Sequence, residues 1–155
     1  MTDEDLAYLA IQRLQRAYSD IATRGAWHEV ASILTPDCRI TFDTRSGEIF
    51  KIEGVIEFGE FAAKMNGVFS FYQYIPLNFV VTIGSDGSAY GRSYSLEVAE
   101  EAQTRDWIES YGVYNDEYVL FENEWRFSRR HYQTHARRRA ERVETFRLDE
   151  RTAPW

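Results

Sequence analysis

The stretch YGVYNDEYVLFENEWRFSRRHY, residues Tyr111–Tyr132, predicts two β-strands joined by a short turn. The first strand is expected over Trp107–Phe121, where β-branched and aromatic residues occupy both parities, as in a strand buried on both faces. Glu122-Asn123-Glu124 is polar and contains an asparagine, which tolerates positive φ, so we expect the turn there. The rest of the chain is therefore expected to be organised around a β-hairpin.

The residues after this turn alternate in character, as in a strand with one buried face. Trp125 and Phe127 lie on the same side of the predicted strand. Arg129 and His131 share their parity, so the apolar face gains a cation and an imidazole toward its end. A pocket is expected at that point, unless a β-bulge shifts the register by one residue.

Composition and charge indicate one soluble globular domain. The chain has 155 residues, 44% of them hydrophobic, and only three prolines, which suits a domain with a real core. A net charge of -7 argues against duplex nucleic acid as a partner. The single Cys38 excludes an internal disulfide and a cysteine-cluster zinc site.

No stretch of the sequence predicts insertion in a membrane. No apolar run approaches the roughly 20 residues of a membrane span. The beginning of the chain, Met1-Thr2-Asp3-Glu4-Asp5, is acidic and does not resemble a signal peptide. We therefore expect a cytoplasmic protein that does not bind membranes.

The first part of the chain shows helical periodicity. Apolar residues from Leu6 to Ile21 recur at helical spacing, and Gly25 stands where a helix C′ residue belongs. A second helix is expected from Trp27 and should be stopped by Pro36. The remaining elements of this part are a strand over Arg39–Asp43, a turn at Ser46-Gly47 and a helix over Val55–Asn66 that follows Gly54.

From Phe69 onward the pattern is typical of strands. Ser85-Asp86-Gly87-Ser88 separates two strand-like runs and predicts a hairpin. Helices followed by antiparallel strands predict an α+β fold, a curved antiparallel sheet wrapped around the N-terminal helices. We expect one domain over residues 1–135 and a C-terminal tail over residues 136–155, which contains the run Arg137-Arg138-Arg139.

Several short segments carry a family resemblance by their order and spacing. They are Tyr18-Ser19-Asp20, Leu34-Thr35-Pro36-Asp37, Gly54-Val55-Ile56, Asn78-Phe79-Val80-Val81, Tyr114-Asn115-Asp116-Glu117 and Glu124-Trp125-Arg126-Phe127. Together they make the chain resemble the SnoaL-like proteins of the nuclear-transport-factor-2-like superfamily, relatives of scytalone dehydratase and ketosteroid isomerase. The match spans Leu6 to Tyr132. It implies a cone-shaped sheet with a pocket in its open mouth, and sheets that commonly pair back to back in homodimers.

The resemblance also shows two departures at acid–base positions. Catalytic relatives carry a second Asp where this chain has Thr23, and often a His in the segment occupied here by Gln73 and Tyr74. If the protein is an enzyme, the proton is therefore expected to be moved by Asp43 or His131. The alternative for His131 is a satisfied core or edge residue.

Four further side chains are candidates for holding or polarising a substrate oxygen. Tyr74 and Asn78 stand where the family lines its pocket. Tyr18 lies on the apolar face of the first helix and could be a core residue or a pocket donor. Tyr94 lies on a strand and could likewise belong to the core or to the pocket.

The hypothesis for function is a lyase or isomerase that uses acid–base catalysis, without cofactor or metal, on a small apolar aromatic or polycyclic molecule. The alternative is a non-catalytic ligand-binding module or a small subunit of an oxygenase-type complex. A homodimer is expected, because both parities of Trp107–Phe121 are rich in apolar groups and the outer face has something to bury.

Overall fold

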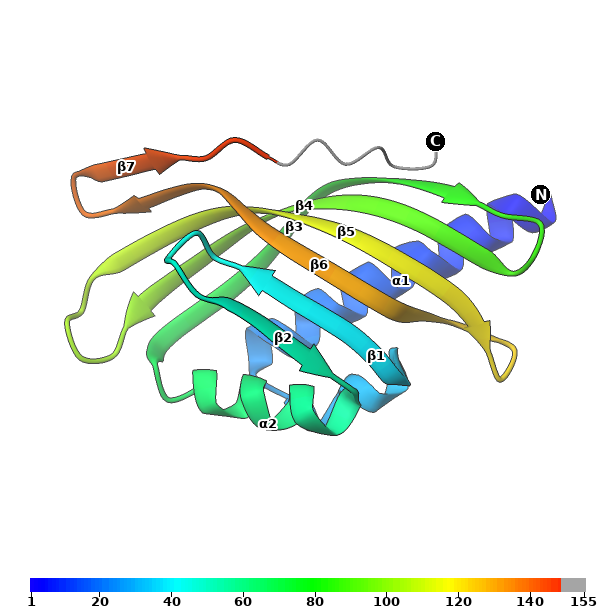
Figure 1. The fold of residues 1–155 in the computed structure, drawn as a ribbon, viewed down its shortest axis with the longest axis horizontal. Coiled ribbons are helices and arrows are strands. Elements are labelled where there is room, and N and C mark those ends of the chain that lie inside the picture. Colours follow the sequence, from blue (N-terminus) through cyan, green and yellow to red (C-terminus); the bar gives the residue numbers. More distant parts are fainter. Residues whose placement is uncertain (149–155) are drawn as a thin grey trace.

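The computed structural model describes residues 1–148. Its helices are confined to the first half of the chain, and most of the second half is β-structure (Figure 1). The elements in chain order are α1 (Asp3–Arg24), the 3-10 helix η1 (Trp27–Ser32), β1 (Leu34–Asp43), β2 (Ile49–Glu53), α2 (Val55–Met65), β3 (Phe69–Ile83), β4 (Ser88–Glu101), β5 (Trp107–Phe121), β6 (Glu124–Arg139) and β7 (Arg142–Thr145). No helix in this range is long and apolar enough to span a bilayer.

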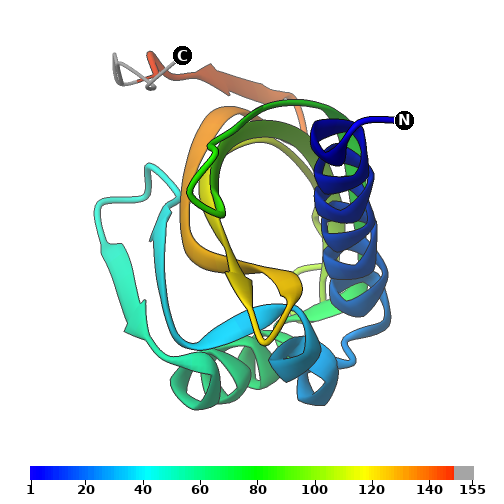
Figure 2. The ribbon, with the colours of Figure 1, turned by 90° about the vertical axis from the view of Figure 1, so that its right-hand side faces the viewer.

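The strands form one strongly curved sheet in the order β2-β1-β6-β5-β4-β3, with β7 paired to β6 beside this path. The sheet bends into an open half-barrel, and α1 runs along its open side while η1 and α2 lie below (Figure 2). The predicted α+β class and the wrapped sheet are confirmed. The sheet is mixed, however, because β1 runs parallel to β6 while the other pairs are antiparallel.

Helix α1 begins and ends as its sequence predicts. The hydroxyl of Thr2 accepts a hydrogen bond from the Asp5 amide, and the Asp5 carboxylate accepts one from the Thr2 amide, a capping box. Gly25 adopts the left-handed conformation that ends the helix, with φ 64°. The buried stripe includes Ile11, Tyr18 and Ile21 and faces the concave side of the sheet.

The prediction for the second helix is wrong in its length and in its stop. The helical segment is a six-residue 3-10 helix that ends at Ser32, and Leu34 already belongs to β1. Pro36 lies inside β1, at an exposed position within the irregular stretch of the β1–β6 register. Because the ladder is interrupted there, the missing proline N–H leaves no gap in it.

The β5–β6 hairpin predicted from the opening stretch is confirmed. Glu122 and Asn123 both have positive φ, 51° and 65°, as a two-residue hairpin turn requires. Tyr118 lies opposite Phe127, whereas Glu117 lies opposite Arg129, so Ser128 is an extra residue in β6. Ser128 is therefore a β-bulge, which shifts the register of β6 by one residue.

The bulge at Ser128 reverses which side chains of β6 face inward. Phe127 and Arg130 are both fully buried on the concave side. Arg129 and His131, which share the parity of Phe127 in the sequence, lie on the opposite face. The expectation that Arg129 and His131 face inward is therefore corrected. The inward-facing cation of β6 is the next residue along the strand, Arg130.

Arg130 is held by an ion pair and by aromatic rings. Its Nε donates to Oδ1 of Asp116 at 2.9 Å, and both side chains are completely buried. Its guanidinium carbon lies 4.0 to 4.1 Å from the ring centroids of Tyr18, Tyr114 and Phe127. This cluster joins α1, β5 and β6 at the centre of the core.

We predict that Asp116→Asn lowers the free energy of unfolding by about 3 to 5 kcal/mol, because it leaves the buried Arg130 cation without its counter-charge. The matched control is Glu117→Gln, whose carboxylate is the next along β5 but pairs with Arg129 on the solvent side. That control should cost less than about 1 kcal/mol. Urea denaturation of the two variants measures the difference, and equal losses would contradict the role given to the buried pair.

Candidate functional site

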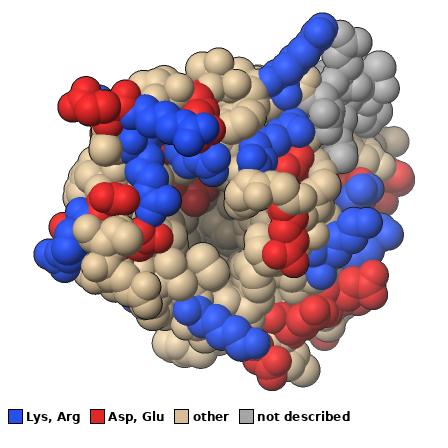
Figure 3. Space-filling model, turned by 60° about the vertical axis from the view of Figure 1, so that its left-hand side comes forward, with Lys and Arg blue, Asp and Glu red and all other residues tan. Residues whose placement is uncertain are grey.

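A cavity of about 1050 Å³ lies between the concave face of the sheet and the helices. It opens at the end of the molecule where β6 and β7 meet the β1–β2 turn, and Figure 3 shows the hollow from that side. Its walls are mainly apolar and aromatic: Tyr18, Ala22, Trp27, Phe42, Phe50, Phe58, Phe61, Ala62, Met65, Phe69, Phe71, Tyr72, Ala99, Ile108, Tyr114 and Tyr132. A cavity of this size and lining suits a drug-sized apolar ligand.

The wall is continuous because elements far apart in the chain contribute rings that touch one another. The ring of Phe42 on β1 stacks on that of Phe61 on α2, with centroids 5.7 Å apart. The rings of Tyr114 on β5 and Tyr132 on β6 are 4.9 Å apart. Gly112 makes room for Tyr132, since a Cβ at that glycine would lie 2.1 Å from the ring.

One carboxyl group, that of Glu97 on β4, lies in this aromatic surrounding. Its Oε1 is enclosed, and its Oε2 accepts a hydrogen bond of 2.8 Å from the Tyr72 hydroxyl. Burial raises the pKa of Glu97 to about 7, against the opposing effects of the Tyr72 hydrogen bond and the Arg130 charge. The hydroxyls of Ser95 and Tyr132 also favour the ionised form, although neither completes a hydrogen bond of normal geometry to Oε1.

The tyrosines around Glu97 are proton donors at neutral pH. Burial raises the pKa of Tyr18 above its ordinary value and raises those of Tyr72 and Tyr132 further. The hydroxyl of Tyr132 accepts a hydrogen bond of 3.4 Å from Thr134, so its own proton can be donated elsewhere. The cavity thus combines one group that titrates near neutrality with hydroxyl groups that stay protonated.

Sequence reasoning missed Glu97 because of its neighbours. Leu96 and Val98 flank it, and the apolar parity of a strand is normally the buried one. In the structure it is Ser95, Glu97 and Ala99 that face the concave side, and the larger residues face outward. The available signal was the row of small residues on that parity, which leaves space for rings from β5 and β6.

The predicted substrate-binding residues are spread over different environments. Tyr18 lines the cavity. Tyr74 is buried behind it, with its ring centroid 5.5 Å from that of Tyr18, and belongs to the core cluster. Asn78 is exposed, and Tyr94 lies half-buried on the outer face of β4. The structure therefore brings Tyr18 and Tyr74 together but not Asn78 or Tyr94, whose roles stay predictions.

The two predicted catalytic residues lie together across the sheet from the cavity. Asp43 is the partner of Gln133 in the β1–β6 ladder, and His131 is the partner of Thr41. Their neighbours in sequence, Phe42 and Tyr132, are the ones that line the cavity. The carboxylate of Asp43 pairs with the Arg45 guanidinium at 3.1 Å and accepts from its amide at 3.1 Å. Their catalytic roles stay a prediction, and the cavity gives that prediction no geometric support.

Thr23 has a structural role at the position where catalytic relatives were expected to carry an Asp. Its hydroxyl accepts a hydrogen bond of 3.0 Å from the amide of Tyr74. It ties α1 to β3 at the rim of the cavity. Among residues 1–148, no group of three or more His, Cys, Asp or Glu side chains is placed to hold a metal ion.

Comparison with known proteins places this geometry in a family. The family model described as the SnoaL-like domain matches residues 3–131, most of the chain. The chain belongs to the SnoaL-like family. The resemblance inferred from the sequence is thereby confirmed. A comparison of this SnoaL-like chain with curated proteins gave no match.

Solved structures support the same fold over the whole length. A candidate scytalone dehydratase from Novosphingobium aromaticivorans has a TM-score of 0.80 at 23% identity, covering 99% of this chain and 100% of that one. A hexachlorocyclohexane dehydrochlorinase of LinA type 3 from Novosphingobium barchaimii has a TM-score of 0.79 at 16% identity, covering 94% and 98%. The protein Kfla4162 from Kribbella flavida has a TM-score of 0.79 at 20% identity, covering 88% and 95%.

We predict that the raised pKa of Glu97 makes Glu97→Gln increasingly stabilising as pH rises. When the pKa of a carboxyl is higher in the folded state than in the unfolded state, the free energy of unfolding of the protein falls as pH rises between the two values. For Glu97 this interval runs from about pH 4.5 to about pH 7. Relative to the parent, the variant should therefore gain up to about 3 kcal/mol in free energy of unfolding across that window.

Denaturation at several pH values tests this, with Glu124→Gln as the control. The Glu124 side chain is 70% exposed at the β5–β6 turn. The difference between this control and the parent should stay constant with pH. If Glu97→Gln behaves in the same way as the control, the carboxyl of Glu97 is not raised by burial.

Proposed function

We propose that this SnoaL-like protein is a lyase or isomerase that works by acid–base catalysis on a small apolar aromatic or polycyclic substrate. The observation that carries the proposal is the position of the Glu97 carboxyl in an aromatic cavity, hydrogen-bonded to Tyr72, where burial raises its pKa to about 7. A base is most effective when its pKa lies near the working pH, because it is then both available and strong enough. Perturbed carboxyl groups in apolar cavities are typical of such sites.

In this proposal Glu97 removes a proton from a carbon atom of the substrate. The electron pair of the broken C–H bond forms the new double bond, and a leaving group departs from the adjacent carbon. The Tyr72 hydrogen bond to Oε2 fixes the orientation of the carboxylate that accepts the proton. The Tyr132 hydroxyl donates a hydrogen bond to the departing group or, in an isomerisation, to the developing oxyanion.

The names of the structural relatives are consistent with this chemistry. A dehydratase and a dehydrochlorinase both eliminate a small group to form a double bond, and both names occur among the proteins with this fold. At these low identities the likeness shows the fold alone, so the chemistry of this chain rests on the Glu97 site.

We predict that Glu97→Gln lowers turnover on the order of 100- to 10,000-fold, since it removes the base and keeps the shape of the cavity. In the parent, kcat/KM should rise with pH through a single ionisation near pH 7, where Glu97 loses its proton. Binding of the substrate, followed by calorimetry, should stay within about tenfold.

Asp43→Asn and His131→Ala belong in the same assay, because these residues are the competing prediction for the base. Parental turnover in Glu97→Gln, together with a large loss in either of the other variants, would reject Glu97 as the base. The substrate panel for this assay consists of halogenated, hydroxylated and keto compounds built on one to four rings.

A non-catalytic binding module is the second candidate function, and the position of Thr23 favours it. At the site where the resemblance implied an Asp, the Thr23 hydroxyl is used to bind backbone of β3. On this reading the cavity holds a ligand for delivery or for a larger oxygenase-type assembly. Ligands from the same panel that bind tightly but are recovered unchanged, at every pH from 5 to 9, would favour this reading over catalysis.

Self-association is also proposed, through the outer face of the sheet. Trp107 and Tyr111 of β5 expose 48% and 40% of their surface on that face. We predict a homodimer, because pairing two such faces would remove these rings from water. Sedimentation equilibrium at micromolar concentration should give twice the monomer mass of 18.2 kDa, and a monomer mass would contradict the proposal.

A further inference from the structure

The charged side chains that line the cavity are mainly arginines, although the chain carries a net charge of -7. Among the described residues they are five arginines and two glutamates: Arg24, Arg45, Arg137, Arg139, Arg142, Glu97 and Glu144. Figure 3 shows basic side chains around the opening, with acidic side chains among them. An apolar cavity with a cationic mouth suggests an amphipathic ligand.

Three of these arginines already have carboxylate partners outside the lining: Arg24 with Asp20 and Glu29, Arg45 with Asp43, and Arg139 with Glu101 and Asp106. Arg137 and Arg142 differ, because within residues 1–148 they share the single carboxylate of Glu144. This trio carries an excess of one positive charge where β6 and β7 meet the opening.

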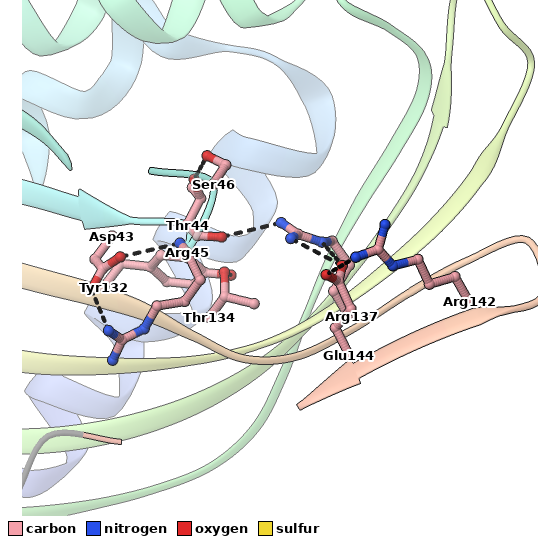
Figure 4. A network of polar contacts seen from close by, with 9 residues as sticks. All are labelled: Asp43, Thr44, Arg45, Ser46, Tyr132, Thr134, Arg137, Arg142 and Glu144. Atoms are coloured by element: carbon pink, nitrogen blue, oxygen red, sulfur yellow. Dashed lines mark hydrogen bonds and ion pairs between the residues drawn. The ribbon is translucent and has the colours of Figure 1, made fainter. Parts of the chain in front are cut away.

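Arg137 is fixed in place and faces the cavity. Its Nη1 donates a hydrogen bond of 3.1 Å to the carbonyl oxygen of Thr44, and its guanidinium lies 5.7 Å from the ring centroid of Phe146. Figure 4 shows it between the β1–β2 turn and β7. In the ladder Glu97 pairs with Ser110, and Ser110 pairs with Arg137, so all three share the concave face. Two strand spacings, on the order of 10 Å, separate the backbones of Glu97 and Arg137.

We propose that Arg137, assisted by Arg142, binds a carboxylate group of the ligand while the apolar body of the ligand occupies the cavity beside Glu97. This rests on the proposed function only in taking the aromatic cavity as the ligand site. The carboxylate site at Arg137 narrows the substrate class to aromatic or polycyclic carboxylates. Such a ligand must be long enough to reach from Arg137 at the opening to Glu97 inside the cavity. A guanidinium is the side chain best suited to this task, because its fork of N–H donors matches a carboxylate.

Glu144 shows that the arginine pair can hold a carboxylate. Its Oε2 accepts hydrogen bonds from Nε and Nη2 of Arg137 at 3.3 and 3.2 Å, and its Oε1 accepts one from Arg142 at 2.9 Å. It lies on β7, a four-residue edge strand that pairs only with β6 among the described strands. A ligand carboxylate would therefore compete with Glu144 for the same donors.

Calorimetric titration with two probes of nearly equal shape tests the anion preference. The probes are 2-naphthoate, which is charged at pH 7.5, and the neutral 2-naphthamide. The parent should bind the naphthoate at least about tenfold more tightly, as expected for a charge-assisted pair at a fixed guanidinium. Arg137→Gln should abolish that preference and leave the affinity for the naphthamide within about threefold of the parental value.

Arg138→Gln is the matched control. Arg138 is the next residue of β6, and it points to the other face, where it pairs with Glu109 at 2.5 Å. This variant should keep the parental preference. Equal binding of both probes by the parent, the same loss in the Arg138 variant, or no binding of either probe would overturn the proposal.

Glu144→Gln tests the competition directly. The variant should bind the naphthoate several-fold more tightly than the parent, because the resident carboxylate no longer occupies the donors. Unchanged or weaker binding would overturn the site as described. All of these titrations measure binding without turnover, so the anion preference stands or fails separately from the catalytic role of Glu97.

Discussion

The rest of the structure depends on the burial of one cation, Arg130, at the centre of the core. A charge without exposure to water needs a counter-charge and hydrogen-bond acceptors, and Asp116 on β5 and Gln15 on α1 supply these to Nε and Nη2 of Arg130. The rings of Tyr18, Tyr114 and Phe127 surround it. Through Gln15 and Tyr18, helix α1 is joined directly to this cluster. The same charge also favours the ionised form of Glu97, so the core and the candidate site are electrostatically linked.

Much of the fold could be predicted from local patterns because those patterns have local physical causes. The capping box at Thr2, the left-handed Gly25 and the two positive φ angles after Phe121 are each determined by a few adjacent residues. The order of these segments was sufficient to indicate the SnoaL-like family. The sequence overestimates the second helix because a proline can end a helix but can also lie at an irregular position in a strand, and Leu34 already belongs to β1.

The candidate site was harder to predict because it depends on which face of each strand is concave. In β4 the small and polar parity faces inward, so Glu97 enters an aromatic cavity that its own segment does not indicate. The prediction of His131 assumes strand parity without the bulge at Ser128, and that of Asp43 assumes that its side of β1 lines the cavity, whereas Phe42 does so. Only the contacts of rings from other elements, such as Tyr132 over Gly112, fix the inner face. Such contacts are not local in the sequence.

Strand β6 contains a second irregularity, at His135, where Tyr111 lies opposite Ala136 and Gly112 lies opposite Thr134. The two irregularities divide the strand into three segments. In each segment, a separate register decides which residues face inward. The first belongs to the core around Phe127, the second supplies Tyr132 and Thr134 to the cavity wall, and the third turns Arg137 and Arg139 to the opening. Because side chains alternate with a period of two, gain or loss of a single residue beyond His135 would exchange the whole set at the opening. In such a fold, ligand preference can diverge through one-residue insertions and deletions that leave the core unchanged.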